Sequence, residues 1–284
     1  MSYAMFGPAG NSESFNERYK VFSDIPKYIS EMNLDIYEYQ FGRGVRMSTN
    51  NATILKEQSK NLGIEITAHA PYYISLSSED ETKRLGSLRY ILETAKAVTE
   101  MGGKRIIIHS GSVGKRNRSE ALILAKDTLS LAMKALDESN YNDVTVCPET
   151  MGKIGQLGDL EEVIQLCSID ERIIPCIDFG HLNARTHGGI KGEEDYLSIL
   201  KTIENDLGKE RLSKFHIHFS KIEYTIGGEK RHLTFEDKEF GPDPDDLLML
   251  IAKMKLEPYI ICESDGTQAE DALTMKQLYV EYIS

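Results

Sequence analysis

Short β-rich runs alternate with longer amphipathic helical patterns about eight times along this chain of 284 residues. The two kinds of segment differ in hydrophobic period, which is about two residues in a strand and about 3.6 in a helix. We expect strands at 3–6, 34–41, 64–69, 105–109, 144–149, 173–178, 215–219 and 259–263. We expect helices at about 23–32, 50–61, 78–101, 119–138, 160–167, 193–207, 245–254 and 268–282. Eight such units predict a (β/α)8 barrel, with residues 1–284 forming one TIM-barrel domain.

The alternative arrangement for such units is an open, doubly wound parallel sheet. The phosphate-binding GxGxxG fingerprint of that fold is absent after the first strand. Gly63, Gly102 and Gly208 follow predicted helices, where a glycine suits the C-terminal cap. No low-complexity linker or charge block divides the chain, so we favour the closed barrel in a single domain.

Net charge, hydropathy and cysteine content argue against a broadly nucleic-acid-binding, membrane-spanning or secreted protein. The formal net charge of −12 argues against broad affinity for nucleic acid outside a local patch. No stretch approaches the about 18 consecutive apolar residues of a membrane span, and the first residues lack the pattern of a secretory signal. Four scattered cysteines without a CxxC pair favour a reducing cytoplasm. We expect Cys147 and Cys176 to be small core residues and not ligands.

In a barrel of this kind the chemistry takes place at the carboxyl ends of the strands. Six of the predicted strands close on a side chain that can bind a metal, and one more histidine follows: His69, His109, Glu149, Asp178, His216, Glu263 and His181. So many imidazoles and carboxylates at one rim would be costly without cations, so we predict a polynuclear metal site. Imidazole and carboxylate ligands without thiolate suit zinc, manganese or iron, and the histidines favour zinc.

The segments around these residues form an ordered series of motifs. They read HAPYYISL from His69, IIIHSGS to Ser112, PETMGKIGQLG from Pro148, CIDFGHLNA from Cys176 and FHIHFSK from Phe215, followed by Glu263. The series resembles that of the endonuclease IV family of apurinic/apyrimidinic DNA endonucleases (AP endonuclease family 2), on the xylose isomerase-like TIM barrel. The resemblance extends from about the second strand to the last, and its specificity lies in the ordered set.

The resemblance implies a cluster of two or three zinc ions, with manganese as a possible substitute. A first ion would be held by His69, His109 and Glu149. Glu149 would bridge to a second ion that is completed by Asp178, His216 and Glu263. A third would be held by His181 together with His232.

The chain departs from the family pattern at the third ion. Lys230 stands where the family has an aspartate ligand, and an ammonium group repels a cation. Either Glu229 reaches in from one residue further, or the third site is weak, differently built or empty. We favour an altered third site.

The resemblance further implies hydrolysis of the phosphodiester on the 5′ side of an abasic site by a zinc-activated hydroxide. Glu149 or Glu263 would orient the nucleophile as catalytic residues. The partner would be damaged duplex DNA, whose abasic nucleotide must leave the helix. No protein partner is evident.

Candidate DNA contacts lie in loops on the same side of the barrel. Tyr72 and Tyr73 follow His69 and are candidates for a wedge at the damaged position, whereas an ordinary pair of solvent-facing tyrosines is the simpler interpretation. Arg43 and Arg46 are candidates for phosphate contacts. The basic run at 115–118 is the best electrostatic indication of a polyanion, although a charged turn is its default interpretation.

Two other functions stay open. A sugar isomerase or epimerase on the same barrel would use one divalent ion, for which Glu149, Asp178, His216 and Glu263 suffice. His69 and His109 would then bind substrate. A barrel that keeps metal only for stability is the third possibility, but structural zinc sites are closed and usually rich in thiolate.

Overall fold

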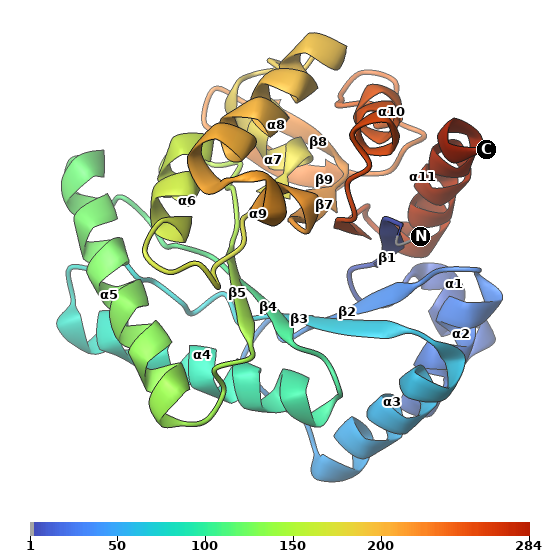
Figure 1. Cartoon of the computed structure of the whole chain (residues 1–284), viewed down its shortest axis with the longest axis horizontal. Coiled ribbons are helices and arrows are strands. Elements are labelled where there is room, and N and C mark those ends of the chain that lie inside the picture. Colours follow the sequence, from blue (N-terminus) through green and yellow to red (C-terminus); the bar gives the residue numbers. More distant parts are fainter. Residues whose placement is uncertain (1–2) are drawn as a thin grey trace.

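The computed structural model describes residues 3–284, in which eight parallel strands form a barrel and helices form an outer ring (Figure 1). The barrel strands are β1 (Met5–Pro8), β2 (Ile36–Gln40), β3 (Glu65–His69), β4 (Arg105–Ile108), β5 (Thr145–Pro148), β6 (Cys176–Asp178), β7 (His216–Phe219) and β10 (Tyr259–Cys262). They pair in the orders β1-β10-β7-β6 and β2-β3-β4-β5. Parallel bridges from Ala9 to Glu38 and from Glu149 to Cys176 join the two halves. The (β/α)8 barrel expected from the sequence is confirmed.

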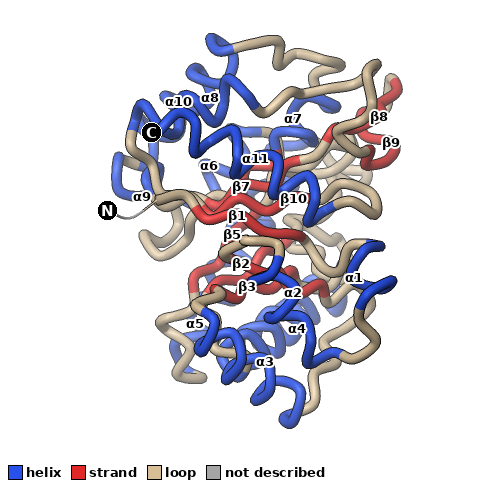
Figure 2. Tube along the Cα trace, turned by 90° about the vertical axis from the view of Figure 1, so that its right-hand side faces the viewer, coloured by secondary structure: helices blue, strands red, loops and turns tan. Residues whose placement is uncertain are grey.

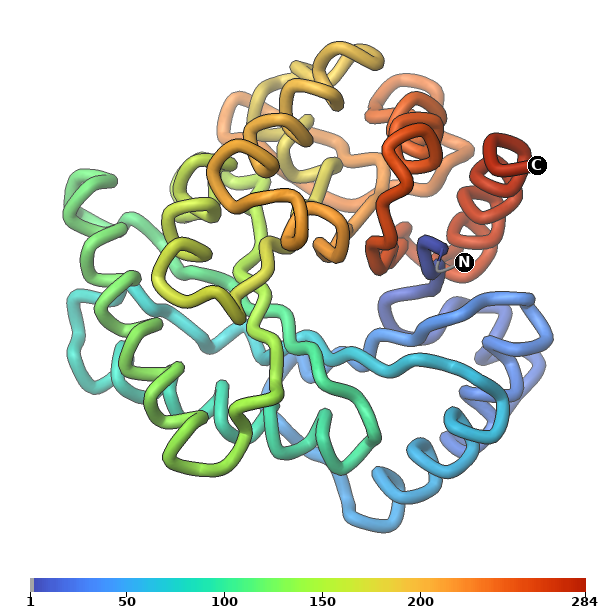
Figure 3. The backbone as a smooth tube through the Cα atoms, in the orientation of Figure 1, coloured from blue at the N-terminus to red at the C-terminus, as the bar shows by residue number. Residues whose placement is uncertain are grey.

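The outer ring follows the chain in order around the barrel (Figure 3). Its helices are α1 (Glu13–Arg18), η1 (Phe22–Asp24), α2 (Ile25–Glu31), α3 (Thr49–Leu62), α4 (Glu81–Glu100), α5 (Arg118–Glu138), α6 (Leu160–Cys167), α7 (Phe179–Arg185), α8 (Glu193–Leu207), α9 (Lys209–Ser213), α10 (Asp245–Met254) and α11 (Gln268–Ile283). No helix among residues 3–284 is long and apolar enough to cross a bilayer.

Helix α7 and a β-hairpin, both near the carboxyl ends of the strands, were not expected from the sequence. Helix α7 begins directly after β6, in a segment too short and polar to show a helical period. The antiparallel hairpin of β8 (Lys221–Thr225) and β9 (Gly228–Leu233) follows β7 and lies outside the barrel beside α7 (Figure 2). Both elements add residues to the mouth of the barrel.

Local sequence fixes where the outer helices start. The side chains of Ser48, Asp80, Asn117 and Asp159 accept backbone N–H groups in the first turns of α3, α4, α5 and α6. Such caps satisfy donors that have no partner within the helix. Gly63 ends α3 in the left-handed conformation, as expected for a C-terminal cap.

A close approach of β1 and β2 depends on Gly7. A Cβ atom at this position would lie 1.7 Å from the carbonyl oxygen of Ile36. The N–H groups of Asp35 and Gly10 donate to the carbonyl oxygens of Phe6 and Glu38 beside the Ala9–Glu38 bridge, and glycine at position 7 allows the strands to come close enough for these contacts.

Successive side chains of strand β7 alternate between the outside and the inside of the barrel. Ile217 and Phe219 belong to the large apolar core between the strands and the helices. His216 and His218 alternate with them and therefore lie inside the barrel, and all four residues are fully buried. A barrel interior is usually filled by branched apolar side chains, so this polar interior marks the region of chemical interest.

Arg118, the last member of the basic run at 115–118, does not face a polyanion. It donates to the two carboxylate oxygens of Glu162 at 2.7 and 2.6 Å, and to the carbonyl oxygens of Ile154 and Gln156 at 2.8 and 3.0 Å. Through these hydrogen bonds Arg118 connects the loop after β5 with the start of α6. The default interpretation of this segment, a charged turn, holds for Arg118.

We expect Arg118→Ala to lower the free energy of unfolding by about 2 kcal/mol, because the buried Glu162 would keep its charge without its cationic partner. Urea unfolding followed by circular dichroism measures this change. The exposed Lys115 offers a matched control, and Lys115→Ala should alter stability by less than about 0.5 kcal/mol. Equal losses in the two variants would contradict the assignment.

Candidate metal centre

The carboxyl ends of the barrel strands surround a hollow of about 450 Å³. Most of the side chains that the sequence singled out line it, including His69, His109, Glu149, His181, His232 and Glu263. The end of β2 contributes Gln40 to the wall, and the loop after β3 contributes Tyr72. The strand ends of a barrel converge on one rim, which explains why residues far apart in sequence meet here.

A first group of potential ligands consists of His69, His109 and Glu149. The Nε2 atoms of His69 and His109 lie 3.1 and 3.0 Å from Oε2 of Glu149. The other ring nitrogen of His69, Nδ1, lies 2.8 Å from the carbonyl oxygen of Ala70, to which it can donate. When the ring is neutral with its proton on Nδ1, this arrangement makes Nε2 available to a metal.

A second group consists of Glu149, Asp178, His218 and Glu263. Nδ1 of His218 lies 3.1 Å from Oε1 of Glu149 and 3.4 Å from Oε1 of Glu263. Oδ2 of Asp178 is buried and, within residues 3–284, has no aligned hydrogen-bond partner. A buried carboxylate oxygen of this kind fits a ligand that faces a cation.

His216 was expected in this second group, and the structure places His218 there instead. Both side chains point into the barrel because they are two residues apart on β7, but His216 lies one layer deeper. Its Nε2 is 3.1 Å from Oε2 of Glu38, below the mouth. The alternation of the strand gives the face of each residue but not its height along the barrel axis.

A third group consists of His181, Glu229 and His232. Nε2 of His181 lies 3.4 Å from Oε2 of Glu229, and its Nδ1 lies 2.9 Å from the carbonyl oxygen of Thr150. Nδ1 of His232 lies 2.9 Å from Oγ of Ser220, which leaves Nε2 free to face the hollow. Of the arrangements that the sequence left open, the structure matches the one in which Glu229 reaches in.

A β-bulge explains why Glu229, and not the residue at position 230, lies beside His181 and His232. In a regular strand Lys230 would share a face with His232. The pairing of β8 with β9 shifts between Glu223 and Tyr224, so Lys230 becomes the extra residue of the bulge. Its ammonium group turns to Glu223, away from the hollow, and Glu229 comes to the face of His232.

Negative charge dominates the centre. Burial alone would raise the pKa of Glu149, yet His218 and hydrogen bonds from His109 and His181 hold that pKa well below its usual value. Burial would lower the pKa of His181, but Asp178 and Glu149 raise it to about 10. A pKa raised this far in a buried imidazole shows that the negative charges around it outweigh the effect of burial. The same field favours divalent cations, so the donor set and its electrostatics fit zinc or manganese.

The candidate DNA contacts lie at different distances from the centre. The exposed ring of Tyr72 lies against those of His69 and His109, with centroids 6.1 and 5.6 Å apart. Tyr73 is also exposed but packs on the ring of Tyr90. Arg43 and Arg46 are exposed beside a second, shallower hollow, which shares Gln40 with the first.

Sequence reasoning missed Glu38, Gln40 and His218. Glu38 lies within a run that reads as an ordinary strand, and no motif distinguishes it. The HxH spacing of β7 was the one signal that could have found His218, because both histidines of such a pair share a face.

The chain matches the xylose isomerase-like TIM barrel family over residues 26–278 and belongs to that family, which is the one expected from its motifs. Its relatives include an uncharacterized protein of Methanocaldococcus jannaschii, 36% identical over 272 residues that cover 96% of each chain. A probable endonuclease 4 of Mycoplasma pneumoniae is 28% identical over 218 residues, which cover 75% of this chain and 72% of the relative.

Solved structures confirm the fold. A D-tagatose 3-epimerase-like protein superposes with a TM-score of 0.74 at 20% identity, covering 98% of each chain. Endonuclease IV from Thermus thermophilus superposes with a TM-score of 0.67 at 17% identity, covering 100% of this chain and 99% of that one. The same barrel therefore occurs in proteins of both names.

Glu149 belongs to two of the three groups, so we expect Glu149→Gln to lose the metal of both. Elemental analysis of the purified protein measures this, with Glu161→Gln as an exposed control that should keep the wild-type content. An amide neutralises the charge while keeping the size, so the loss would report coordination and not packing. Full metal content in Glu149→Gln would show that this carboxylate does not join the two groups.

Substitutions at Glu229 and Lys230 test which of these two neighbouring residues belongs to the third group. We expect Glu229→Gln to lower the metal content by about one ion per chain, because His181 and His232 alone leave the site short of an anionic ligand. Lys230→Gln should leave the content unchanged, because Lys230 faces Glu223. Metal titration with a chromophoric chelator measures both. A loss in Lys230→Gln alone would contradict the role of the bulge.

Proposed function

We propose that this protein is a metal-dependent endonuclease that hydrolyses the phosphodiester 5′ to an abasic site in duplex DNA. The observation that carries the proposal is the sharing of Glu149 between two adjoining ligand groups, with a third group alongside them. A centre of this kind suits displacement at phosphorus, where several oxygens carry negative charge at once. The family, and the relative named probable endonuclease 4, support the same activity.

The first group would hold one ion, the second group another, and His181, Glu229 and His232 a third. Zinc is the metal that these donors favour, with manganese as the substitute. When bound, the ions supply positive charge to the phosphate oxygens and a nucleophile at neutral pH.

The carboxylates of Glu149 and Glu263 would orient the nucleophile and manage its proton. Burial raises the pKa of Glu263, which His218 opposes and Glu149 reinforces. A carboxyl group with a raised pKa can take up a proton near the reacting atoms and release it again. Glu149 is held ionised by its imidazole neighbours and is suited to ligation and not to proton transfer.

Loops around the mouth would bind the damaged duplex. Tyr72 stands exposed directly beside His69 and His109, so its ring is placed to fill the space that the extruded abasic nucleotide leaves. Tyr73 on the same loop would contact the neighbouring bases. Arg43 and Arg46 would contact phosphates of the strand that crosses the second hollow. With a net charge of −12, DNA affinity would depend on these local contacts and on the cations of the centre.

A sugar epimerase is the second candidate. Glu149, Asp178, His218 and Glu263 form one compact group that would hold a single ion, and the barrel superposes on a D-tagatose 3-epimerase-like protein. In that reaction the histidines of the first and third groups would not be needed as ligands. The number of bound ions therefore separates the two candidates.

Incision of a duplex oligonucleotide that carries one abasic analogue tests the proposal. We expect cleavage on the 5′ side, loss of cleavage after chelation, and recovery with zinc. His109→Ala should lose most of the activity, whereas His187→Ala, which alters an exposed histidine outside the groups, should keep it. Absence of incision, together with a single ion per chain and interconversion of ketose epimers, would replace the endonuclease by the epimerase.

A further inference from the structure

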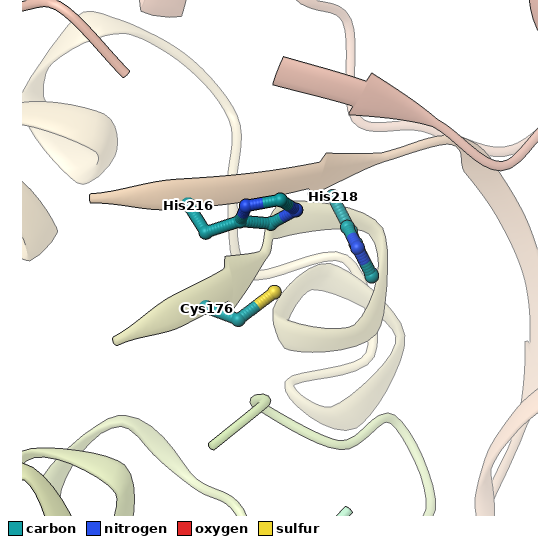
Figure 4. Close-up of side chains that lie close together, drawn as sticks. All are labelled: Cys176, His216 and His218. Atoms are coloured by element: carbon teal, nitrogen blue, oxygen red, sulfur yellow. The ribbon is translucent and has the colours of Figure 1, made fainter. Parts of the chain in front are cut away.

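A second set of metal-binding side chains lies inside the barrel, below the mouth. Cys176 on β6 and His216 on β7 are partners in the parallel ladder, and His218 follows two residues later (Figure 4). All three side chains are fully buried. Their ligating atoms lie within 4.8 Å of one another, which is close enough for a single ion. The sequence led us to expect Cys176 as a small core residue, because a lone cysteine gives no ligand signal.

The ring nitrogens in this set are poorly satisfied by hydrogen bonds. Within residues 3–284, neither ring nitrogen of His216 has an aligned hydrogen-bond partner, and neither has Nε2 of His218. Nevertheless the two Nε2 atoms lie 3.1 Å from different carboxylate oxygens of Glu38. The two Nε2 atoms are therefore close to the carboxylate without an aligned hydrogen bond to it. Buried polar atoms of this kind call for a partner.

Glu38 is held firmly beside the two imidazoles. Its carboxylate accepts hydrogen bonds from Thr67 Oγ1 at 3.1 Å and from Gln40 Nε2 at 3.0 Å, and it is fully buried. A thiolate at Cys176 and the carboxylate of Glu38 carry two negative charges together. A divalent cation would balance these charges in a place where an unpaired charge is costly.

We propose that Cys176, His216 and His218 bind a divalent ion of the zinc type inside the barrel, with Glu38 beside it as the balancing anion. Thiolate and imidazole are both zinc ligands, and the fully buried surroundings close the site to solvent. On binding, the thiol of Cys176 gives up its proton to solvent as the metal–sulfur bond forms. The site shares His218 with the second group at the mouth but differs from all three mouth groups in containing sulfur, and its existence does not depend on the reaction catalysed there.

His218 connects this interior site to the mouth. Its Nε2 faces Glu38 inside the barrel, while its Nδ1 faces Glu149 and Glu263. Occupation of both sides requires the imidazole to release both ring protons to solvent. The interior ion would therefore hold the ring of His218 in place for the second group of the centre.

Cobalt substitution tests the proposal, because a thiolate bound to Co²⁺ gives an intense near-ultraviolet charge-transfer band. The protein is produced in medium with cobalt in place of zinc, so that a closed site fills during folding. The mouth groups lack sulfur and cannot give the band. We expect the band in the wild type, its loss in Cys176→Ser, and a metal content lower by about one ion per chain in that variant.

Cys147→Ser is the matched control, since Cys147 is also a buried thiol of the barrel interior but belongs to no ligand group. It should keep the band, as should Cys167→Ser and Cys262→Ser. If Cys176→Ser does not fold, retention of the band in the three other variants assigns it to Cys176 by elimination. A folded, cobalt-containing wild type without the band would overturn the proposal, as would a band that persists in folded Cys176→Ser. Neither result would bear on DNA incision, which is measured separately.

Discussion

Glu149 takes part in both the candidate metal centre and the closure of the barrel, the first through its carboxylate and the second through its backbone. Its Oε2 lies within 3.1 Å of His69 and His109, and its Oε1 lies 3.1 and 3.3 Å from His218 and His181. The two oxygens thus face different sets of imidazoles. The same residue forms the backbone bridge to Cys176 that closes the barrel between β5 and β6. Separation of the half-barrels at this bridge would part Glu149 from Asp178 and His218, so the second group depends on closure of the barrel.

A layer of polar side chains lies under the mouth and makes the centre possible. Burial would raise the pKa of Glu38, but His218 and His216 lower it, so this carboxylate stays ionised inside the barrel. Burial lowers the pKa of His216 to about 4, so that imidazole is neutral. An apolar layer would cost less to bury, since each of these groups loses its hydration. The layer instead orients Gln40 and His218 from below and thereby shapes the wall of the hollow.

The sequence predicted the rim well and the details of the ligand groups less well, for geometric reasons. Parallel strands in a barrel bring their carboxyl ends to one side, so His69, His109, Glu149 and Glu263 could be placed together from the alternation of strands and helices alone. The choice between His216 and His218 depends on the stagger of β7 against its neighbours, which the sequence does not record.

Two further features escaped the sequence because they arise from tertiary structure. The bulge that turns Lys230 outward and Glu229 inward is a property of the pairing between β8 and β9. Arg118 reads as part of a basic surface until the position of Glu162 on α6 is known, 44 residues away in sequence. In both cases the sequence shows the charged residue, but it does not show which partner its side chain contacts.

The orientation of the histidines argues that the first and third groups are built for metal and not for a sugar. In His69, His181 and His232, Nδ1 lies within hydrogen-bond distance of a backbone carbonyl or a hydroxyl, and Nε2 remains for the hollow. A donor bond at Nδ1 orients the ring so that Nε2, once it gives up its proton, can bind a metal. A histidine that recognises sugar hydroxyls gains nothing from a fixed tautomer, because a hydroxyl both donates and accepts. Three histidines with the same arrangement in the first and third groups therefore favour a centre of several ions over a single-ion epimerase.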